Sequence, residues 1–291
     1  MNNPVCRAAA IHDMSGFGRV SLSVIIPILS TMGVQTCPLP TAVLSTHTGG
    51  YTDYSFIDLT ENMTRMIEHW KALDLKFDAI YSGFLGSPRQ VDIVMDFIND
   101  FKDEDQLVVV DPVMGDDGKP YSTMNREMMD EMKKLVLMAD VITPNFTEAA
   151  FLLDREYRTE MENGEIKEWI LRLADNGIKK VILTSVPIKG KKRQSSVVAY
   201  DSDDGRFWKI DCDYIPAYFP GTGDIFSSVI VGSLLQGDSL PIALDRAVQF
   251  VSIGIRATFG YNYPTREGVM LERVLSNLRG PVLASSYEMM E

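Results

Sequence analysis

The sequence predicts an α/β protein in which a mostly parallel central sheet carries helices on both faces. Two observations lead to this fold class. Short apolar runs rich in β-branched residues alternate with longer segments of helical period, and several of these runs end in small or polar residues. The 291 residues contain no internal repeat, linker or low-complexity stretch. We therefore expect a single domain over residues 1–291.

Five apolar runs are the clearest strand candidates. They lie near Val5–Ile11, Ala79–Ser82, Leu107–Asp111, Val141–Thr143 and Val181–Thr184. Ligands of open α/β sheets bind beyond the carboxyl ends of the strands. The polar residues that end these runs are therefore where we expect the chemistry.

The helices between the strands are amphipathic. Segments 58–72, 87–101 and 124–138 have helical period, and the methionines of the last one indicate an adaptable core rather than a ligand surface. Pro27 interrupts a helical run over residues 21–32, so we expect a kink or a late helix start there.

Residues 194–214 depart from the alternation of strands and helices, because two runs of strand-forming residues flank a turn at 203–205. This pattern predicts a hairpin. The short basic cluster Lys189–Arg193 lies beside it in the sequence, and we assign it no role.

Composition excludes several classes of partner. The chain has 28 basic and 40 acidic residues, a formal net charge of −12, which disfavours binding to nucleic acid or to an anionic membrane surface. Its three cysteines show no metal-ligand spacing, and no uncharged apolar run of about 18 residues occurs. We expect a cytoplasmic protein that binds any anionic substrate through local amides, a metal or a few basic groups.

The stretch YFPGTGDIFSS, residues 218–228, leads directly into an apolar helix. Gly221 and Gly223, on either side of Thr222, allow a tight turn with exposed amide N–H groups at the positive end of the helix dipole, which together form an anion hole. Asp224 follows where a phosphate-binding loop of the Walker type would have lysine, and that motif occurs nowhere in the chain. An aspartate here can deprotonate a neutral hydroxyl, which indicates the acceptor side of a phosphoryl transfer. A plain helix cap is the alternative.

Oxygen ligands for a metal follow two of the predicted strands. Asp111, Asp116 or Asp117, Asn145 and Glu148 lie at or just past strand ends. Mg²⁺ prefers such ligands, and phosphoryl transfer depends on neutralising phosphate oxygens. A simple turn at Asp111 and a helix N-terminus at Asn145 through Glu148 are the structural alternatives.

A further group of polar residues lies in glycine-rich turns near the N-terminus. His47, in the stretch STHTGGY, is surrounded by threonine and glycine, a setting that suits hydrogen bonding to a small molecule. His12 and His69 are better explained as structural residues. The fragment SGFGR is too incomplete to indicate dinucleotide binding.

These motifs in this order resemble the ribokinase-like kinases and, within them, the vitamin B6 kinases. The resemblance runs from AIHDMSGFGR through STHTGGY, YSGFLGS, VVDPVMGD, TPNFTEA and ILTSV to FPGTGDIFSS. It implies a three-layer α/β/α sandwich without a large lid domain, a homodimer, and ATP-dependent phosphorylation, with Mg²⁺, of the 5′-hydroxymethyl group of pyridoxal, pyridoxamine or pyridoxine. A role for a monovalent cation such as K⁺ stays open.

The resemblance also implies roles for individual residues. Asp224 would be the catalytic base beside the anion hole of Gly221, Thr222 and Gly223. The positions that it assigns to ATP are Asp111, Asp116, Tyr121, Asn145, Glu148, Thr184 and Ser185, with Asp111 and Glu148 also at the metal. The positions that it assigns to the pyridine ring are His47, Thr48 and Gly49.

Asp13 departs from the family pattern, because many pyridoxal kinases have serine there. An aspartate could accept a hydrogen bond from a ring substituent or a protonated ring nitrogen, and hydroxymethylpyrimidine kinases also have an aspartate in this first loop. A hydroxymethylpyrimidine or hydroxymethylpyrimidine phosphate kinase is therefore the main alternative. A catalytically idle vitamer-binding protein on the same scaffold is the alternative from another class.

Overall fold

The computed structural model describes residues 4–190, 194–213, 215–280 and 285–290. A ten-stranded sheet runs through the molecule in the order β12-β11-β10-β9-β8-β5-β4-β1-β2-β3. Its strands are β1 (Arg7–Ser15), β2 (Gln35–Leu44), β3 (Phe56–Asp58), β4 (Ala79–Ser82), β5 (Leu107–Val110), β8 (Val141–Ile142), β9 (Lys180–Val186), β10 (Gln194–Asp201), β11 (Arg206–Asp213) and β12 (Tyr287–Met289). The six from β2 to β9 pair in parallel, and β3, β10, β11 and β12 add antiparallel strands at the two edges.

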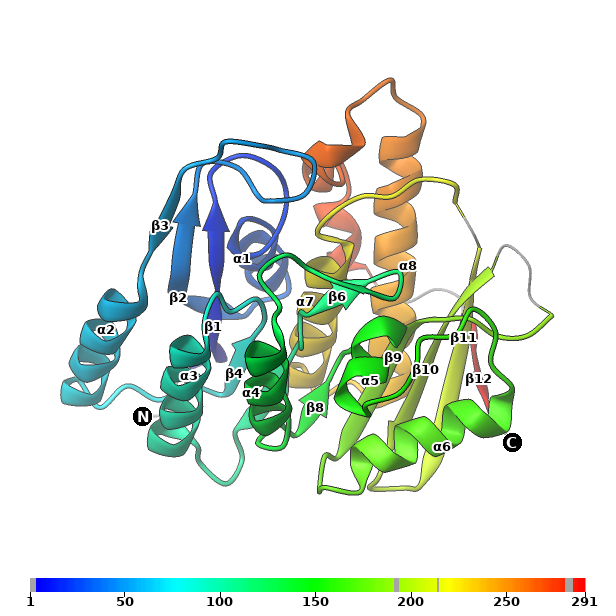
Figure 1. Cartoon of the computed structure of the whole chain (residues 1–291), viewed down its shortest axis with the longest axis horizontal. Coiled ribbons are helices and arrows are strands. Elements are labelled where there is room, and N and C mark those ends of the chain that lie inside the picture. Colours follow the sequence, from blue (N-terminus) through cyan, green and yellow to red (C-terminus); the bar gives the residue numbers. More distant parts are fainter. Residues whose placement is uncertain (1–3, 191–193, 214, 281–284, 291) are drawn as a thin grey trace.

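Helices cover both faces of the sheet, as Figure 1 shows. They are α1 (Leu22–Thr31), α2 (Thr60–Ala72), α3 (Pro88–Phe101), α4 (Arg126–Val136), α5 (Phe146–Leu152), α6 (Asn163–Ala174), α7 (Thr222–Leu235) and α8 (Leu240–Phe259), and short 3₁₀ turns at 265–267, 271–273 and 275–279 follow them. One apolar core lies between the sheet and α2 to α6, and the other between the sheet and α1, α7 and α8. The predicted three-layer α/β/α sandwich is confirmed.

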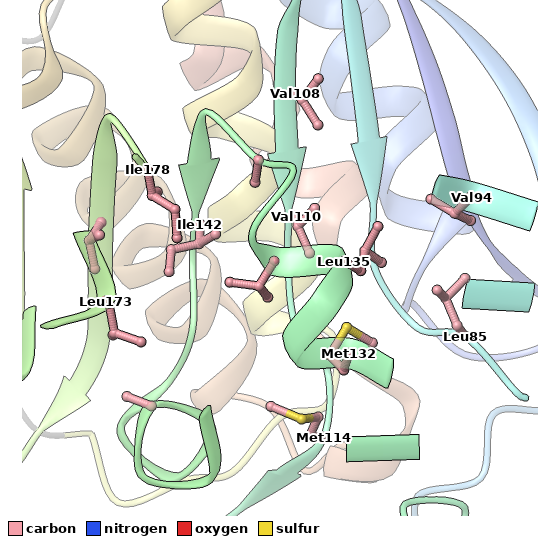
Figure 2. Packing of buried hydrophobic residues seen from close by; sticks show 14 of the residues in the cluster. Leu85, Val94, Val108, Val110, Met114, Met132, Leu135, Ile142, Leu173 and Ile178 are labelled. Atoms are coloured by element: carbon pink, nitrogen blue, oxygen red, sulfur yellow. The ribbon is translucent and has the colours of Figure 1, made fainter. Parts of the chain in front are cut away.

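The two cores follow from the alternation of side chains along the strands. In β5, Val108 and Val110 face the layer of α2 to α6, whereas Val109 faces the layer of α7 and α8. Figure 2 shows Val108 and Val110 packed in the first core with Met132 and Leu135 of α4. The predicted role of the methionine-rich helix as core is confirmed.

The described chain carries no large lid over the sheet. A small antiparallel hairpin, β6 (Gly115–Asp116) and β7 (Lys119–Pro120), follows β5 instead. The predicted hairpin over 194–214 is present as β10 and β11. Lys191 to Arg193 of the basic cluster lie outside the described residues. Among the described helices, none combines the length and apolar character that crossing a bilayer requires.

Two local expectations need correction. Of the two alternatives predicted for Pro27, a kink or a late helix start, the late start is wrong, because α1 begins at Leu22 and contains Pro27. The first strand does not end at Ile11 but continues to Ser15, with a register shift between His12 and Met14. Asp13 therefore lies within a strand, at an irregularity in its pairing with β2, and not in a loop.

The second strand, β2, had no counterpart among the clear strand candidates because it contains Pro38 and Pro40. Proline cannot donate a hydrogen bond to a neighbouring strand and is restricted to edges. The strand β3 pairs only with Ala42 to Leu44 of β2. The half of β2 that contains the prolines is thus an edge, where the missing N–H groups cost little.

Candidate active site

A cavity of about 420 Å³ lies at the carboxyl ends of β5, β8 and β9, a volume within the range of small-molecule sites. Hairpin β10–β11 and helices α7 and α8 complete its wall. Eleven residues predicted from the sequence line it: Asp111, Asp116, Tyr121, Asn145, Glu148, Thr184, Ser185, Gly221, Thr222, Gly223 and Asp224. The structure therefore brings together every residue assigned to ATP, the metal or the catalytic turn.

The turn at Gly221 to Asp224, proposed from the sequence as the catalytic turn, is built by close contact between segments far apart in the sequence. Gly221 has φ 81°, and a Cβ atom there would lie 2.2 Å from the carbonyl oxygen of Arg19, so both conformation and space require glycine. Helix α7 begins at the next residue. Gly223 is exposed, and apart from its chain neighbours and the backbone of its own helix, no atom of the described residues lies within 4 Å of a Cβ built on it. A ligand can therefore approach the amides at the start of α7 from the cavity.

Asp224 lies in the first turn of α7 and is partly accessible from the cavity. Its Oδ2 atom accepts a hydrogen bond of 2.8 Å from the backbone N–H of Ser21. The pKa of Asp224 is raised to about 7, chiefly by burial and to a smaller extent by the charges of Asp111 and Asp13, while the hydrogen bond from the Ser21 N–H opposes the shift. A carboxyl group with this pKa suits a general base near neutral pH.

Asp111 is buried and directly follows strand β5. Its Oδ2 atom accepts a hydrogen bond of 3.1 Å from the hydroxyl of Ser227, which is 2.9 Å from the hydroxyl oxygen of Thr143. Burial raises the pKa of Asp111 to about 6, and the Ser227 and Thr143 hydroxyls limit the rise. The two hydroxyls were not predicted, because serine and threonine in an apolar helix and strand give no distinctive pattern.

Glu148 and Asn145 combine a capping box with a place in the cavity wall. The backbone N–H of Asn145 donates to Glu148 Oε2 at 2.8 Å, the N–H of Glu148 donates to the Asn145 side chain at 2.9 Å, and the N–H of Met114 donates to Glu148 Oε1 at 3.0 Å. Burial, followed by the charge of Asp111, holds the pKa of Glu148 well above its usual value. Asn145 and Glu148 therefore form the helix cap that was the structural alternative, and they also line the cavity.

The carboxyl groups of Asp111 and Glu148 fit a divalent cation. Both are buried, and the charge of Asp111 opposes ionisation of Glu148, so a cation between them would relieve an unfavourable arrangement. Within the described part of the chain, no three His, Cys, Asp or Glu side chains form a cluster that could hold a metal. This donor set suits Mg²⁺, which commonly binds to one or two carboxylates and completes its shell with phosphate oxygens and water.

The loop after β5 and the strand β9 supply the remaining predicted wall. Asp116 belongs to hairpin β6–β7, where burial raises its pKa, and Tyr121 follows that hairpin with 39% of its surface exposed. Thr184 and Ser185 lie inside β9 rather than at its end, and Ser185 has φ 57°.

The sequence did not predict part of the cavity wall. The wall residues without a sequence signal include Ser195, Val197, Cys212, Tyr218, Val248, Val251 and Ile255. Most of these have generic strand or helix patterns that carry no signal for a cavity.

The residues assigned to the pyridine ring do not line this cavity. Asp13 is 5% exposed, and its two oxygens accept hydrogen bonds from the hydroxyls of Ser21, at 2.6 Å, and Ser15, at 3.2 Å. Its charge nevertheless raises the pKa of Asp224, so the two carboxyl groups are near neighbours. Thr48 and Gly49 are exposed, in the turn that follows strand β2.

His47 is buried, and both of its ring nitrogens have partners in the protein. Nε2 lies 2.6 Å from the carbonyl oxygen of Arg266, and Nδ1 accepts a hydrogen bond of 3.1 Å from the N–H of Gly49. Because a carbonyl only accepts, Nε2 carries the proton. His47 thus ties its turn to the segment after α8, and in this arrangement neither nitrogen is free for a ligand. His12 is buried against Tyr81, with 4.4 Å between the ring centroids.

The fold and the cavity define a kinase of the ribokinase-like class, without a lysine-bearing phosphate loop. Residues 26–267 match the phosphomethylpyrimidine kinase family, and the chain belongs to that family. It also belongs with the pyridoxal kinases. The pyridoxal kinase of Arabidopsis thaliana is 30% identical to it over 286 residues, which cover 93% of this chain and 89% of that protein.

Two solved proteins show how far the likeness extends in three dimensions. A Bacteroides thetaiotaomicron protein provisionally named a phosphomethylpyrimidine kinase is 56% identical, with a TM-score of 0.97 over 100% of this chain and 99% of that one. A second crystal form of that protein contains pyridoxal. The pyridoxal kinase of Lactobacillus plantarum is 29% identical, with a TM-score of 0.86 over 94% of this chain and 96% of that one.

Proposed function

We propose that the protein transfers the γ-phosphoryl group of ATP to the 5′-hydroxymethyl oxygen of a vitamin B6 vitamer: pyridoxal, pyridoxamine or pyridoxine. The observation that carries this proposal is the position of Asp224. Its carboxyl group has a pKa of about 7 and lies at the start of α7, beside the open backbone of Gly223 and within a cavity of small-molecule size. The names of the relatives support the vitamer as the substrate, and the pyridoxal bound to the 56% identical protein supports it further.

The proposed mechanism gives each part of the catalytic turn a task. The carboxylate of Asp224 accepts the proton of the substrate hydroxyl, and the oxygen attacks the γ-phosphorus in line. The bond from that phosphorus to the bridging oxygen of ADP breaks as the new bond forms. The N–H groups at Gly221 to Gly223 and the positive end of α7 stabilise the charge on the transferred phosphoryl group.

The other wall residues hold the nucleotide. Asp111 and Glu148 would hold Mg²⁺ together with phosphate oxygens. When bound, the ion neutralises charge on the β- and γ-phosphates. Thr184 and Ser185 would contact the phosphates or ribose, and Asp116 and Tyr121 would cover the phosphates from hairpin β6–β7. The proposal also includes a cytoplasmic location and a homodimer. Sedimentation velocity on the purified chain would test the homodimer.

The test is product formation with a panel of alcohols. The protein is incubated with ATP, Mg²⁺ and either pyridoxal, pyridoxamine, pyridoxine or hydroxymethylpyrimidine, and phosphorylated products are identified by mass spectrometry. The proposal predicts a 5′-phosphate from at least one vitamer with higher kcat/KM than for the pyrimidine. Tight vitamer binding with no product from any alcohol would instead indicate a catalytically idle binding protein.

The second candidate is a hydroxymethylpyrimidine kinase. The description of the matched family and the aspartate at position 13 favour it. Clearly higher kcat/KM with the pyrimidine would establish this function and overturn the vitamer assignment.

A further inference from the structure

Ser21 contacts two carboxyl groups that lie far apart in the sequence, those of Asp13 and Asp224. Its backbone N–H donates to Asp224 Oδ2 at 2.8 Å, and its hydroxyl donates to Asp13 Oδ1 at 2.6 Å. Ser21 itself is 7% exposed, so both hydrogen bonds are shielded from water. Ser21 therefore joins the proposed base, Asp224, to the carboxyl group of Asp13.

The backbone of Ser21 has a conformation that residues with a side chain rarely adopt. Its φ is 48° and its ψ is −136°, and the N–H of Ser23 donates to the carbonyl of Val20 at 3.2 Å. This is the first central position of a type II′ turn, where glycine is preferred. Serine is strained here, and such strain persists where the surroundings over-determine the conformation.

The angle φ describes rotation about the bond between the backbone nitrogen and Cα, so it fixes the direction of the N–H relative to the side chain. At φ 48° the two donors of Ser21 reach two different acceptors at once. The hydroxyl anchored at Asp13 opposes relaxation of the turn to negative φ. Such a relaxation would turn the N–H away from Asp224.

We propose that Ser21 is a positioning residue that ties the orientation of the base Asp224 to the contact at Asp13. This inference rests on the proposed function and adds how the two sides of the site are coupled. The contact of its hydroxyl with Asp13 maintains the strained turn, and the turn directs the N–H that orients the base. A substrate ring that engages Asp13 therefore acts on a carboxyl group linked to the catalytic one through a single residue.

Two variants separate the hydroxyl from the backbone conformation. Ser21→Ala removes the hydroxyl and keeps the strain, so the turn relaxes and the N–H leaves Asp224. Ser21→Gly also removes the hydroxyl, but glycine adopts positive φ without strain and keeps the N–H in place. With pyridoxal, we expect kcat of Ser21→Ala to fall about tenfold or more, the usual effect of losing one hydrogen bond to a charged group. We expect kcat of Ser21→Gly to stay within about twofold of wild type.

KM for the vitamer provides the second readout. It should rise several-fold in both variants because both remove a donor to Asp13, while KM for ATP should stay unchanged. Ser15→Ala is the matched control: it removes the other hydroxyl from Asp13 at a residue without positive φ, so it should raise KM for the vitamer without the loss of kcat. Equal kcat values for Ser21→Ala and Ser21→Gly, whether high or low, would overturn the proposal.

Folding and the identity of the reaction are checked separately. Circular dichroism and the melting temperature report whether each variant folds. Both variants lose the hydrogen bond to Asp13, and Ser21→Gly should melt above Ser21→Ala because glycine is unstrained at φ 48°. If Ser21→Ala does not fold, Ser21→Gly decides alone, since a kcat below about half of wild type contradicts the proposal. A wild-type protein that phosphorylates none of the alcohols would refute the proposed function itself, which distinguishes that failure from the failure of this inference.

Discussion

The cavity wall and the two N-terminal turns differ in how their polar groups are used. The first turn is considered together with the end of strand β1, as residues 13–21, and the second comprises residues 45–51. The wall presents the open backbone of Gly223 and the exposed rings of Tyr121 and Tyr218 to an open cavity. In the turns, the carboxylate of Asp13 and the imidazole of His47 already have partners within the protein. This difference supports the proposal that the wall receives the ligand and that the turns set the geometry around Asp224.

The strongest test of this contrast is the removal of the base. Asp224→Ala should lower kcat about 100-fold or more, because a positioned general base usually contributes at least that factor. The cavity wall should stay intact, so nucleotide affinity measured by calorimetry should change little. Retention of more than about a tenth of wild-type turnover would contradict the role of Asp224 as base.

The metal-binding part of the wall should respond next most strongly. Asp111→Asn should raise the Mg²⁺ concentration needed for half-maximal turnover and lower kcat by about 10- to 100-fold, the usual effect of disturbing a metal site. Asp117→Asn is the matched control, because Asp117 is exposed in the same loop and does not line the cavity. Equal Mg²⁺ dependence of the two variants would place the metal elsewhere.

The pH dependence of the reaction should report Asp224. Its pKa of about 7 means that the ionised form, which accepts the proton, predominates above pH 7 and is lost below it. In the free protein, kcat/KM for the vitamer should therefore fall about tenfold for each pH unit below 7. Measurement at saturating Mg²⁺ and ATP between pH 5.5 and 8.5 checks this, and a flat profile across that range would count against it.

The smallest effects should distinguish the two glycines of the catalytic turn. Gly221→Ala should lower the free energy of unfolding by about 2 kcal/mol or more, since alanine is strained at φ 81° and its Cβ meets the Arg19 carbonyl. Gly223→Ala should leave stability unchanged or raise it by up to about 1 kcal/mol, because alanine favours a helix. Its methyl group should instead raise KM for ATP a few-fold. Urea denaturation and steady-state kinetics measure the two effects.

The same contrast explains which parts of the site the sequence predicted. Asp111 and Asn145 follow parallel strands, and parallel strands bring their ends to one edge of a sheet, so local patterns sufficed for the cavity wall. The turn at Gly221 to Asp224 was also evident, because glycines before an apolar helix are a local signal.

The N-terminal turns depend on contacts that no local pattern contains. The partner of His47 is the carbonyl of Arg266, 219 residues away, and the partner of the Ser21 N–H is Asp224, 203 residues away. The sequence therefore suggested His47 as a ligand for a small molecule, whereas the structure shows both nitrogens bonded internally. Asp13 was expected in a loop, because the strand extends past Ile11 through an irregularity that only its pairing with β2 reveals.

One competition assay tests the central claim most directly. The protein is given equal, subsaturating concentrations of pyridoxal and hydroxymethylpyrimidine with ATP and Mg²⁺, and the two phosphorylated products are quantified from the same mixture. Their ratio equals the ratio of the two kcat/KM values. The account predicts that the 5′-phosphate of pyridoxal predominates, whereas a clear excess of the pyrimidine phosphate would contradict it.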